Sequence, residues 1–270
     1  MTKLKIWKEE RSWEEAERLW EEKAAVARRL KPLKRLPILP SIPGITPETQ
    51  HHLKLKSLFY ILFHKEGWKI IRSFCKHPLR YGLRYLRSSF KKKSYIREGD
   101  FFYYGFSSQK AFLEKAADPE SLLVVGFSYC QKPHECPSGR FTPDCIRDPD
   151  NLVCSQCPIG KAIHALPERA IPLLIPTIHY IGEQIFTLTH QNPAKQILFL
   201  ITACELTLEM FGDLGNMVGA LGIGVRLDGR ICNTMKAFVL SEEGIKPGLT
   251  VLTDSTEAKV LQILRLLRGQ

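Results

Sequence analysis

The chain of 270 residues carries eight cysteines, and five of them fall within the 28 residues from Cys130 to Cys157. This segment reads CQKPHECPSGRFTPDCIRDPDNLVCSQC, and its prolines, glycine and short polar residues predict a long loop built from turns. A loop of this length inside a compact domain needs something to hold it. Ligation of a metal by the cysteine thiolates would supply that restraint.

Cys154 and Cys157 form the tightest unit, because a two-residue spacer lets both thiolates face one metal. The most direct set of metal ligands adds Cys130 and Cys136 to this pair. Cys145 is the next choice, either completing the same site or belonging to a second one.

Three kinds of chemistry compete for these cysteines. Structural disulfides are disfavoured, because the N-terminus shows no apolar export signal and the cytosol is reducing. A thioredoxin-like pair at Cys154 and Cys157 agrees with C-x-x-C but leaves the other cysteines unexplained. A metal site uses them all. His134 is one more candidate ligand, although a lone histidine in a polar loop is more often solvated.

The sequence favours an iron–sulfur cluster, with zinc as the alternative cofactor. Thiolate ligands suit both. Zinc sites usually come as two C-x-x-C units, whereas the loop cysteines are spaced 6, 9, 9 and 3 residues apart. With Cys204 and Cys232 they also exceed the four ligands that one zinc ion needs. We therefore expect a metal-binding protein with a redox or electron-transfer role, or else a zinc-stabilised binding module without redox activity.

Cys204 and Cys232 each follow a predicted strand, so both are expected at the C-terminal edge of the sheet, where open α/β sheets bind ligands. They are candidates for cofactor binding, or for the nucleophile of a thiol enzyme with Glu205 nearby. The simpler alternative is two buried core cysteines. Asp213 and Asp228 are further acid–base candidates, although surface solvation is the simpler role for Glu205 and for both aspartates. Cys75 is expected to be a packing residue.

The elements that must position these residues alternate between strand and helix. Short apolar, branched segments predict strands at 122–127, 171–175, 197–202, 223–227 and 238–240. Helical patterns fall at 159–166, 181–189 and 206–221, and a last helix begins near Asp254. This alternation predicts an α/β domain over residues 98–270, with a mostly parallel sheet covered by helices.

Residues 1–97 are predicted to form a basic helical extension. Ser12 and Glu15 match a capping box, and a helix should follow until Pro32. One face of this helix carries five apolar residues: Trp13, Ala16, Trp20, Ala27 and Leu30. Prolines then predict an extended strap over residues 31–49.

Charge is concentrated in the same part of the chain. The net charge is +11, and residues 51–97 contain 13 basic side chains against one acid, Glu66. Two basic amphipathic helices are expected there, broken near His77. The simplest interpretation is that their aromatic side chains pack on the main domain. An anionic membrane surface or an acidic protein is the next partner, and nucleic acid is third because no nucleic-acid-binding motif accompanies the charge. The apolar segments are too short to span a bilayer, so we expect a cytoplasmic protein with peripheral membrane attachment as one option.

Three separated motifs resemble the cysteine-rich family catalogued as domain of unknown function no. 116. The matching segments are CQKPHECP…CSQCPIGKA, then LFLITACELTLE, then GVRLDGRICNT, which together cover roughly residues 126–238. The family shows C…CP…C-x-x-C…G, then A-C-E after a strand, then G-x-C-x-T. The matching residues are Cys130, Cys136, Pro137, Cys154, Cys157, Gly160, Ala203, Cys204, Glu205, Gly229, Cys232 and Thr234.

The resemblance implies metal binding by an iron–sulfur protein without an established reaction, and it groups Cys204 and Cys232 with the loop cysteines. Family members often carry one more cysteine just after the C-x-x-C pair, whereas residues 158–161 have none here. Cys145 would take its place. The basic extension lies outside the resemblance, and the redox partner is left open.

Overall fold

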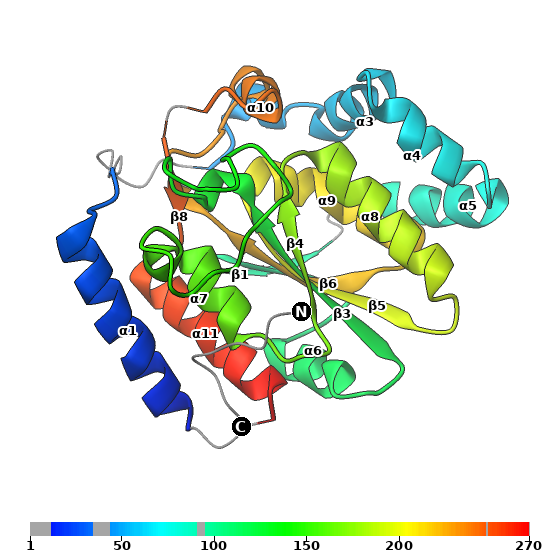
Figure 1. Cartoon of the computed structure of the whole chain (residues 1–270). Helices are drawn as coiled ribbons and strands as arrows, with labels where there is room; N and C mark the ends of the chain where they lie inside the picture. The colour runs from blue at the N-terminus through cyan, green and yellow to red at the C-terminus, as the bar shows by residue number, and fades with distance from the viewer. Residues whose placement is uncertain (1–11, 35–43, 91–94, 247, 270) are drawn as a thin grey trace.

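A six-stranded sheet runs through the middle of the molecule, and helices cover both of its faces (Figure 1). The structure is a computed structural model that describes residues 12–34, 44–90, 95–246 and 248–269. The expected α/β fold with a mostly parallel sheet covered by helices is confirmed. The strands are β1 (Ile96–Glu98), β2 (Phe101–Tyr104), β3 (Ser121–Ser128), β4 (Ile171–Ile175), β5 (Gln196–Ala203) and β6 (Leu221–Arg226).

The strand order in the sheet is β1-β2-β6-β5-β3-β4. Strands β6, β5, β3 and β4 are parallel, and β2 and β1 extend this core as antiparallel edge strands. The chain moves outward from β3 to β4, then crosses back to β5 on the other side of β3. The order therefore reverses between β3 and β5, which is where doubly wound sheets open a crevice at the carboxyl ends of their strands. A separate two-stranded sheet pairs β7 (Asp228–Gly229) with β8 (Thr250–Val251).

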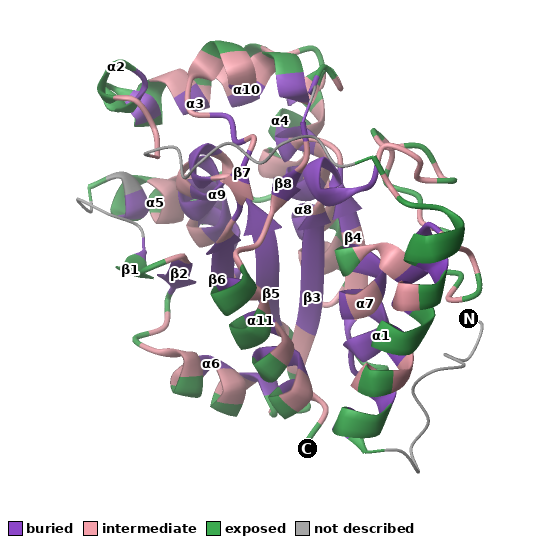
Figure 2. Cartoon of the chain, turned by 90° about the vertical axis from the view of Figure 1, so that its left-hand side faces the viewer, coloured by how far each residue is buried: buried purple, intermediate pink, exposed green. Residues whose placement is uncertain are grey.

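Alternate residues of the strands feed two apolar layers, as the two-residue period of a strand requires. One layer packs beneath α1 (Trp13–Leu30), α6 (Gln109–Ala116), α7 (Pro158–Ala165) and α11 (Asp254–Leu267). The opposite layer packs beneath α8 (Ile178–Gln191) and α9 (Glu205–Val218). Figure 2 shows β3, β5 and β6 buried along most of their length, while α1 and α11 expose their outer sides.

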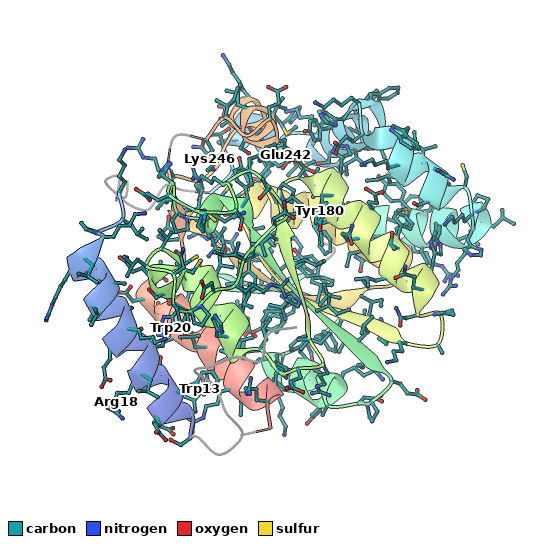
Figure 3. The ribbon with its side chains drawn as sticks, viewed as in Figure 1. Trp13, Arg18, Trp20, Tyr180, Glu242 and Lys246 are labelled. Atoms are coloured by element: carbon teal, nitrogen blue, oxygen red, sulfur yellow. The ribbon has the colours of Figure 1, made fainter. Side chains whose placement is uncertain are left out.

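The first helix agrees with its prediction. The Ser12 hydroxyl accepts a hydrogen bond from the Glu15 backbone N–H, and Trp13 and Trp20 are buried. In Figure 3 these two rings point from α1 towards the core, whereas Arg18 points away. Leu30 is an exception, because it lies at the exposed end of the helix and not on the buried face.

Helices α3 (Leu53–Phe63), α4 (Gly67–Phe74) and α5 (Pro78–Ser89) lie against α8 and α9. They join the same apolar layer through Leu53, Ile61, Ile70 and Tyr81. The expected first basic helix is two helices, because the chain turns at Gly67. A Cβ atom there would overlap the carbonyl oxygens of the preceding turn.

The prediction that the aromatic side chains of the basic helices pack on the main domain is correct for only half of them. Tyr60, Phe74, Tyr81 and Tyr85 do pack against the core, although only Tyr81 is fully buried. The prediction was wrong for four others, whose rings are more than half exposed: Phe59, Phe63, Trp68 and Phe90. These side chains lie on the outer sides of helices whose inner sides already fill the core. Cys75 is also exposed, so its expected packing role is not observed.

Short segments of the chain differ from their predicted secondary structure in two places. Residues 238–240 belong to helix α10 (Met235–Glu242) and not to a strand. The Thr234 hydroxyl caps this helix by accepting a hydrogen bond from the Ala237 N–H, at 3.2 Å. The antiparallel strands β1 and β2 and helix α6 were not expected. Strand β2 consists of four buried aromatic residues, a pattern without alternation.

Part of the predicted strap lies outside the described residues, which resume at Gly44. Thr46 then caps the short helix α2 (Pro47–Gln50), so this end of the strap is helical. None of the helices within the described ranges combines the length and the apolar character that crossing a bilayer requires.

The close contact between β5 and β6 yields a stability prediction. A Cβ atom at Gly222 would overlap the carbonyl oxygen of Phe199 on the neighbouring strand. We expect Gly222→Ala to lower the free energy of unfolding in urea by about 1–3 kcal/mol. Gly82→Ala is the matched control in α5, where the nearest atom is 3.8 Å away. It should be neutral or stabilise by about 0.5–1 kcal/mol. Equal losses in both variants would contradict the assigned packing.

Candidate functional site

Three cysteines meet at the carboxyl edge of the sheet, where the strand order reverses. Cys130 lies in the short helical turn that follows β3, and Cys204 lies between β5 and α9. Cys232 follows β7 and precedes α10. All three line one cavity of about 30 Å³. The structure thus brings Cys204 and Cys232 together at the predicted sheet edge and adds Cys130 to them.

A buried lysine contacts one of these thiols. The Nζ atom of Lys246 donates a hydrogen bond to the Cys232 Sγ atom at 3.0 Å, and Lys246 is 8% exposed. No ion pair joins this ammonium group to a carboxylate within the described ranges. Because a buried cation is costly without an anion beside it, the contact assigns Cys232 as a thiolate.

The neighbouring thiol supports the same assignment. Interaction with the Cys204 thiol is the largest cause that lowers the pKa of Cys232 to about 5, and the charge of Lys246 acts in the same direction. The pKa of Cys204 is raised well above its usual value, because of its interaction with Cys232 and because the thiol is buried. Cys232 is therefore the more acidic thiol of the two.

Glu242 lies close to the same cavity, and Figure 3 shows it with Lys246 at the same end of the molecule. Its carboxylate accepts a hydrogen bond from the Ile178 N–H at the start of α8, at 2.7 Å. Burial raises the pKa of Glu242 to about 8. The site therefore contains a carboxyl group that exchanges a proton near neutral pH, a feature that the sequence did not reveal.

The other four loop cysteines form a separate group. Cys136, Cys145, Cys154 and Cys157 line a cavity of about 20 Å³. Sequence reasoning placed Cys130 in this group and made Cys145 a second choice. The structure instead groups Cys145 with the C-x-x-C pair and places Cys130 with Cys204 and Cys232.

Buried cations hold the loop in place. Lys132 is 2% exposed, and its Nζ atom donates hydrogen bonds to the carbonyl oxygens of Thr142 and Asp144 and to the Thr142 hydroxyl, at 2.9–3.2 Å. Arg140 donates to the carbonyl oxygens of Lys246, Gly248 and Cys130. These bonds satisfy carbonyl groups that no regular element pairs, so the irregular segment keeps a defined shape.

Burial dominates the chemistry of the C-x-x-C pair. It raises the pKa of Cys154 to about 11 and that of Cys157 to about 12. The backbone N–H groups of Ile159 and Gly160, in the first turn of α7, bond to the Cys157 sulfur and oppose this rise. Arg147 and Lys132 line the same cavity, so positive charge accompanies the four thiols.

His164 is a residue that the sequence analysis missed. It lies on α7 and lines the four-cysteine cavity, and its buried Nδ1 atom has no hydrogen-bond partner among the described residues. Burial lowers its pKa to about 4, so the ring is neutral at physiological pH. The Trp20 ring of α1 covers it at a centroid distance of 5.2 Å. The only sequence signal was its position seven residues after Cys157, on the helix that the C-x-x-C pair begins.

Helix α1 packs against the short helical turn Cys154–Gln156 and pairs with α7. Lys161 of α7 pairs with Glu17 and Glu21 of α1, at 3.1 and 2.7 Å. Lys23 pairs with Asp150 of the loop at 2.7 Å. The N-terminal helix is therefore part of the site, although its sequence predicted only a generic amphipathic helix.

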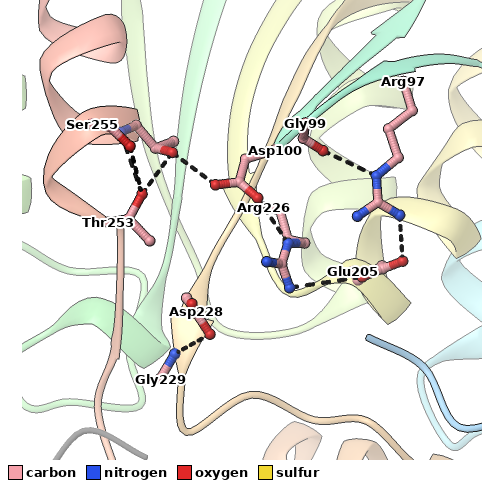
Figure 4. Close-up of polar contacts among 10 residues, drawn as sticks. Arg97, Gly99, Asp100, Glu205, Arg226, Asp228, Gly229, Thr253 and Ser255 are labelled. Carbon is pink, nitrogen blue, oxygen red and sulfur yellow. Dashed lines mark hydrogen bonds and ion pairs between the residues drawn. The ribbon is translucent and has the colours of Figure 1, made fainter. Parts of the chain in front are cut away.

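The acidic candidates have structural partners. Figure 4 shows Glu205 between Arg97 and Arg226, with Oε1 2.6 Å from the Arg97 Nη1 atom and Oε2 3.9 Å from the Arg226 Nη1 atom. Asp213 accepts a hydrogen bond from Ser88 at 2.7 Å, and Asp228 accepts one from the Gly229 N–H at 2.8 Å. Glu205 and Asp213 are buried, so the expectation of surface solvation was wrong for both.

The arrangement of the cysteines limits what they can bind as placed. No disulfide joins any of the eight cysteines, all of which lie within the described residues. Across the same described residues, no group of three or more His, Cys, Asp or Glu side chains is arranged to hold a metal ion. His134, the candidate ligand of the loop, lines neither cysteine cavity.

Comparison with known proteins adds no assignment. No protein-family model matches the sequence, and no curated protein or solved structure matches it either. The two cysteine groups themselves are the features that bear on function.

The contact between Lys246 and Cys232 yields a pH prediction. In the reduced protein, the ultraviolet absorbance of the Cys232 thiolate, taken as the difference from Cys232→Ser, should disappear as the pH falls through about 5. Because the folded pKa lies below the ordinary value of 9.0, the stability contributed by this thiolate is complete above pH 9.0 and is lost as the pH falls through about 5.

Lys246→Met should move this titration to higher pH, since it removes the charge that faces the sulfur. Lys236→Met is the control. Lys236 is an exposed residue of helix α10, so its replacement should leave the titration in place. An unshifted titration in Lys246→Met would refute the assigned ion pair.

Proposed function

We propose that the chain is an iron–sulfur protein in which Cys136, Cys145, Cys154 and Cys157 hold the cluster. The observation that carries the proposal is that these four cysteines line a single cavity. Four thiolates are the usual ligand set of such clusters, and the donors here are soft sulfur atoms. The proposal agrees with the family resemblance, which implied an iron–sulfur protein from the sequence motifs.

The spacing of the cysteines favours a cluster over a single zinc ion. Zinc sites usually combine two C-x-x-C units, whereas these four cysteines include only one, at Cys154 and Cys157. The other two cysteines are spaced nine residues apart from each other and from this pair.

The surroundings suit electron transfer. Lys132 and Arg147 place positive charge beside thiols that become anionic on ligation, and burial together with hydrogen bonds to sulfur sets the potential of such a centre. A bound cluster would accept and release single electrons. The chain would hold the thiolates, exclude water through α1, and present the loop to a redox partner.

A second candidate function is favoured by the contact between Lys246 and Cys232. A thiolate beside a protonated thiol is the arrangement of a reactive cysteine pair, so Cys232 would be the nucleophile and Cys204 the neighbouring proton donor. Glu205, expected nearby, is held by Arg97 and Arg226 and has no such role. In this case the metal would fix the loop, and the chemistry would occur at the sheet edge.

The ligand assignment is tested by metal analysis. Protein purified without oxygen should contain iron and sulfide in stoichiometric amounts and absorb visible light. Cys145→Ser and Cys154→Ser should each weaken iron retention more than about tenfold, since removing a ligand costs at least as much as removing its hydrogen-bond partners. Cys75→Ser and Cys232→Ser are the controls, and both should keep the cluster.

The other outcomes separate the alternatives. If the protein contains zinc but no iron, the loop holds a structural zinc site in a binding module. Loss of iron in Cys232→Ser but not in Cys145→Ser would refute the division of the cysteines into two groups. Neither metal, with rapid alkylation of Cys232 alone, would favour the thiol enzyme.

We also propose that helices α3, α4 and α5 attach the protein to an anionic membrane surface. Among the described residues, nine of the 17 exposed large apolar side chains belong to residues 53–90, from Leu55 to Phe90. On α5 the exposed apolar residues recur at Leu79, Leu83 and Leu86, the spacing of one helix face. Exposed basic residues accompany them, and no carboxylate of the described residues pairs with Arg72, Arg80 or Arg87. An interfacial helix combines these features.

Co-sedimentation with vesicles tests this attachment. The protein should bind vesicles that contain phosphatidylglycerol and leave pure phosphatidylcholine vesicles unbound. Replacing Arg72, Arg80 and Arg87 by Ala should weaken partition by roughly two orders of magnitude, since each basic side chain near an anionic surface contributes about 1 kcal/mol. The matched control replaces Arg29, Lys110 and Lys236. Equal binding by both triple variants would contradict the proposal, and binding to polyglutamate alone would favour an acidic protein partner.

A further inference from the structure

A large apolar cavity lies beneath the basic helices. It has a volume of about 810 Å³ and is lined by residues of α3, α4 and α9, with Tyr85 from α5. Most of its wall is aliphatic or aromatic, including Leu58 and Leu62 of α3. Its volume falls within the range of about 300–1,000 Å³ that is usual for pockets that bind small organic ligands.

We infer that this cavity binds one acyl chain of a membrane lipid, taken up from the surface on which the helices lie. The inference rests on the membrane attachment proposed above and specifies what the attached face binds. A flexible hydrocarbon chain needs an apolar wall, no matching hydrogen bonds and an opening towards the bilayer. The cavity supplies the first two through its lining, and its position supplies the third.

The cavity opens at the exposed apolar surface. Leu55 and Ile71 both line it, and their side chains are 55% and 42% exposed. The same two residues belong to the apolar surface of α3 and α4, so hydrocarbon in contact with these helices is continuous with the cavity. A chain that entered here would exchange one apolar environment for another without crossing water.

The polar groups of the cavity wall do not call for a charged ligand inside. Asp213 bonds to Ser88 and pairs with Lys54 at 3.8 Å, and Glu209 accepts a hydrogen bond from Tyr95. Ser57 is the exception, because its buried Oγ atom has no hydrogen-bond partner in the described part of the chain. This hydroxyl is a potential donor to an ester or carboxyl oxygen at the head of the chain. The charged headgroup would stay outside, near the exposed Lys65, Arg72 and Lys76.

The test uses the metal-loaded protein and cis-parinaric acid, a fluorescent fatty acid, below the concentration at which it aggregates and without vesicles. We expect saturable binding of one molecule per chain. Leu58→Trp and Leu62→Trp fill the cavity from half-buried positions and should each weaken binding about tenfold or more, because several methylene groups lose their apolar contacts. Leu240→Trp, on α10 and outside the cavity, is the control.

A second measurement uses Cys75, an exposed cysteine that lines the cavity. Phosphatidylglycerol vesicles should slow its reaction with a maleimide in the native protein, with the modified residue assigned by mass spectrometry, and less so in Leu62→Trp. No saturable binding by the native protein, or equal binding by the filled variants, would overturn the inference. If vesicles sediment with the protein while parinaric acid does not bind, membrane attachment stands and the acyl site fails. If parinaric acid binds while vesicles do not sediment with the protein, membrane attachment is refuted and the cavity is a site for free fatty acid.

Discussion

The reversal of strand order between β3 and β5 is the constraint on which the rest of the structure depends. Helices on the two sides of this point must cover opposite faces, so α7 lies on one face while α8 and α9 lie on the other. The chain segments that leave β3 and β5 therefore separate at the carboxyl edge. Cys130 and Cys204 are the residues at that separation, and Cys232, in contact with Lys246 from the far side of α10, lines the same cavity.

Division of the seven clustered cysteines follows from this geometry and from the length of the loop. Cys130 remains at the sheet edge because it comes directly after β3. The chain then crosses towards α7, where the next four thiols gather against the opposite apolar layer. Lys132 lies between the two groups in the chain and turns its ammonium group onto loop carbonyls. One group thus has a buried cation beside sulfur, while the other consists of four cysteines around one cavity.

Sequence patterns predicted the elements better than they predicted the site. Continuous apolar strands and helix caps are local signals, so β3 to β6, α7 to α9 and α11 were placed correctly, whereas the short, non-alternating β2 was missed. The position of Cys204 and Cys232 at a strand edge was also a local inference. Three features depend on contacts across the fold, which the spacing of residues does not encode. They are the grouping of Cys145 with the C-x-x-C pair, the position of His164 beside the four cysteines, and the contact of Lys246 with Cys232. Exposure of Phe59 and Phe63 was missed because a helix with apolar residues on two sides shows the same composition as a buried one.

Helix α9 connects the thiol pair with the apolar cavity. Cys204 lies immediately before its first turn, and Met210, Leu214 and Met217 further along form a wall of the cavity. The four-cysteine group lies beyond the sheet, against the layer that contains α7 and α1. The helices that carry exposed apolar and basic residues therefore cover one face, and the proposed cluster lies on the other. With this arrangement a membrane-attached molecule would turn its cluster side towards the aqueous phase, where a water-soluble redox partner can reach it.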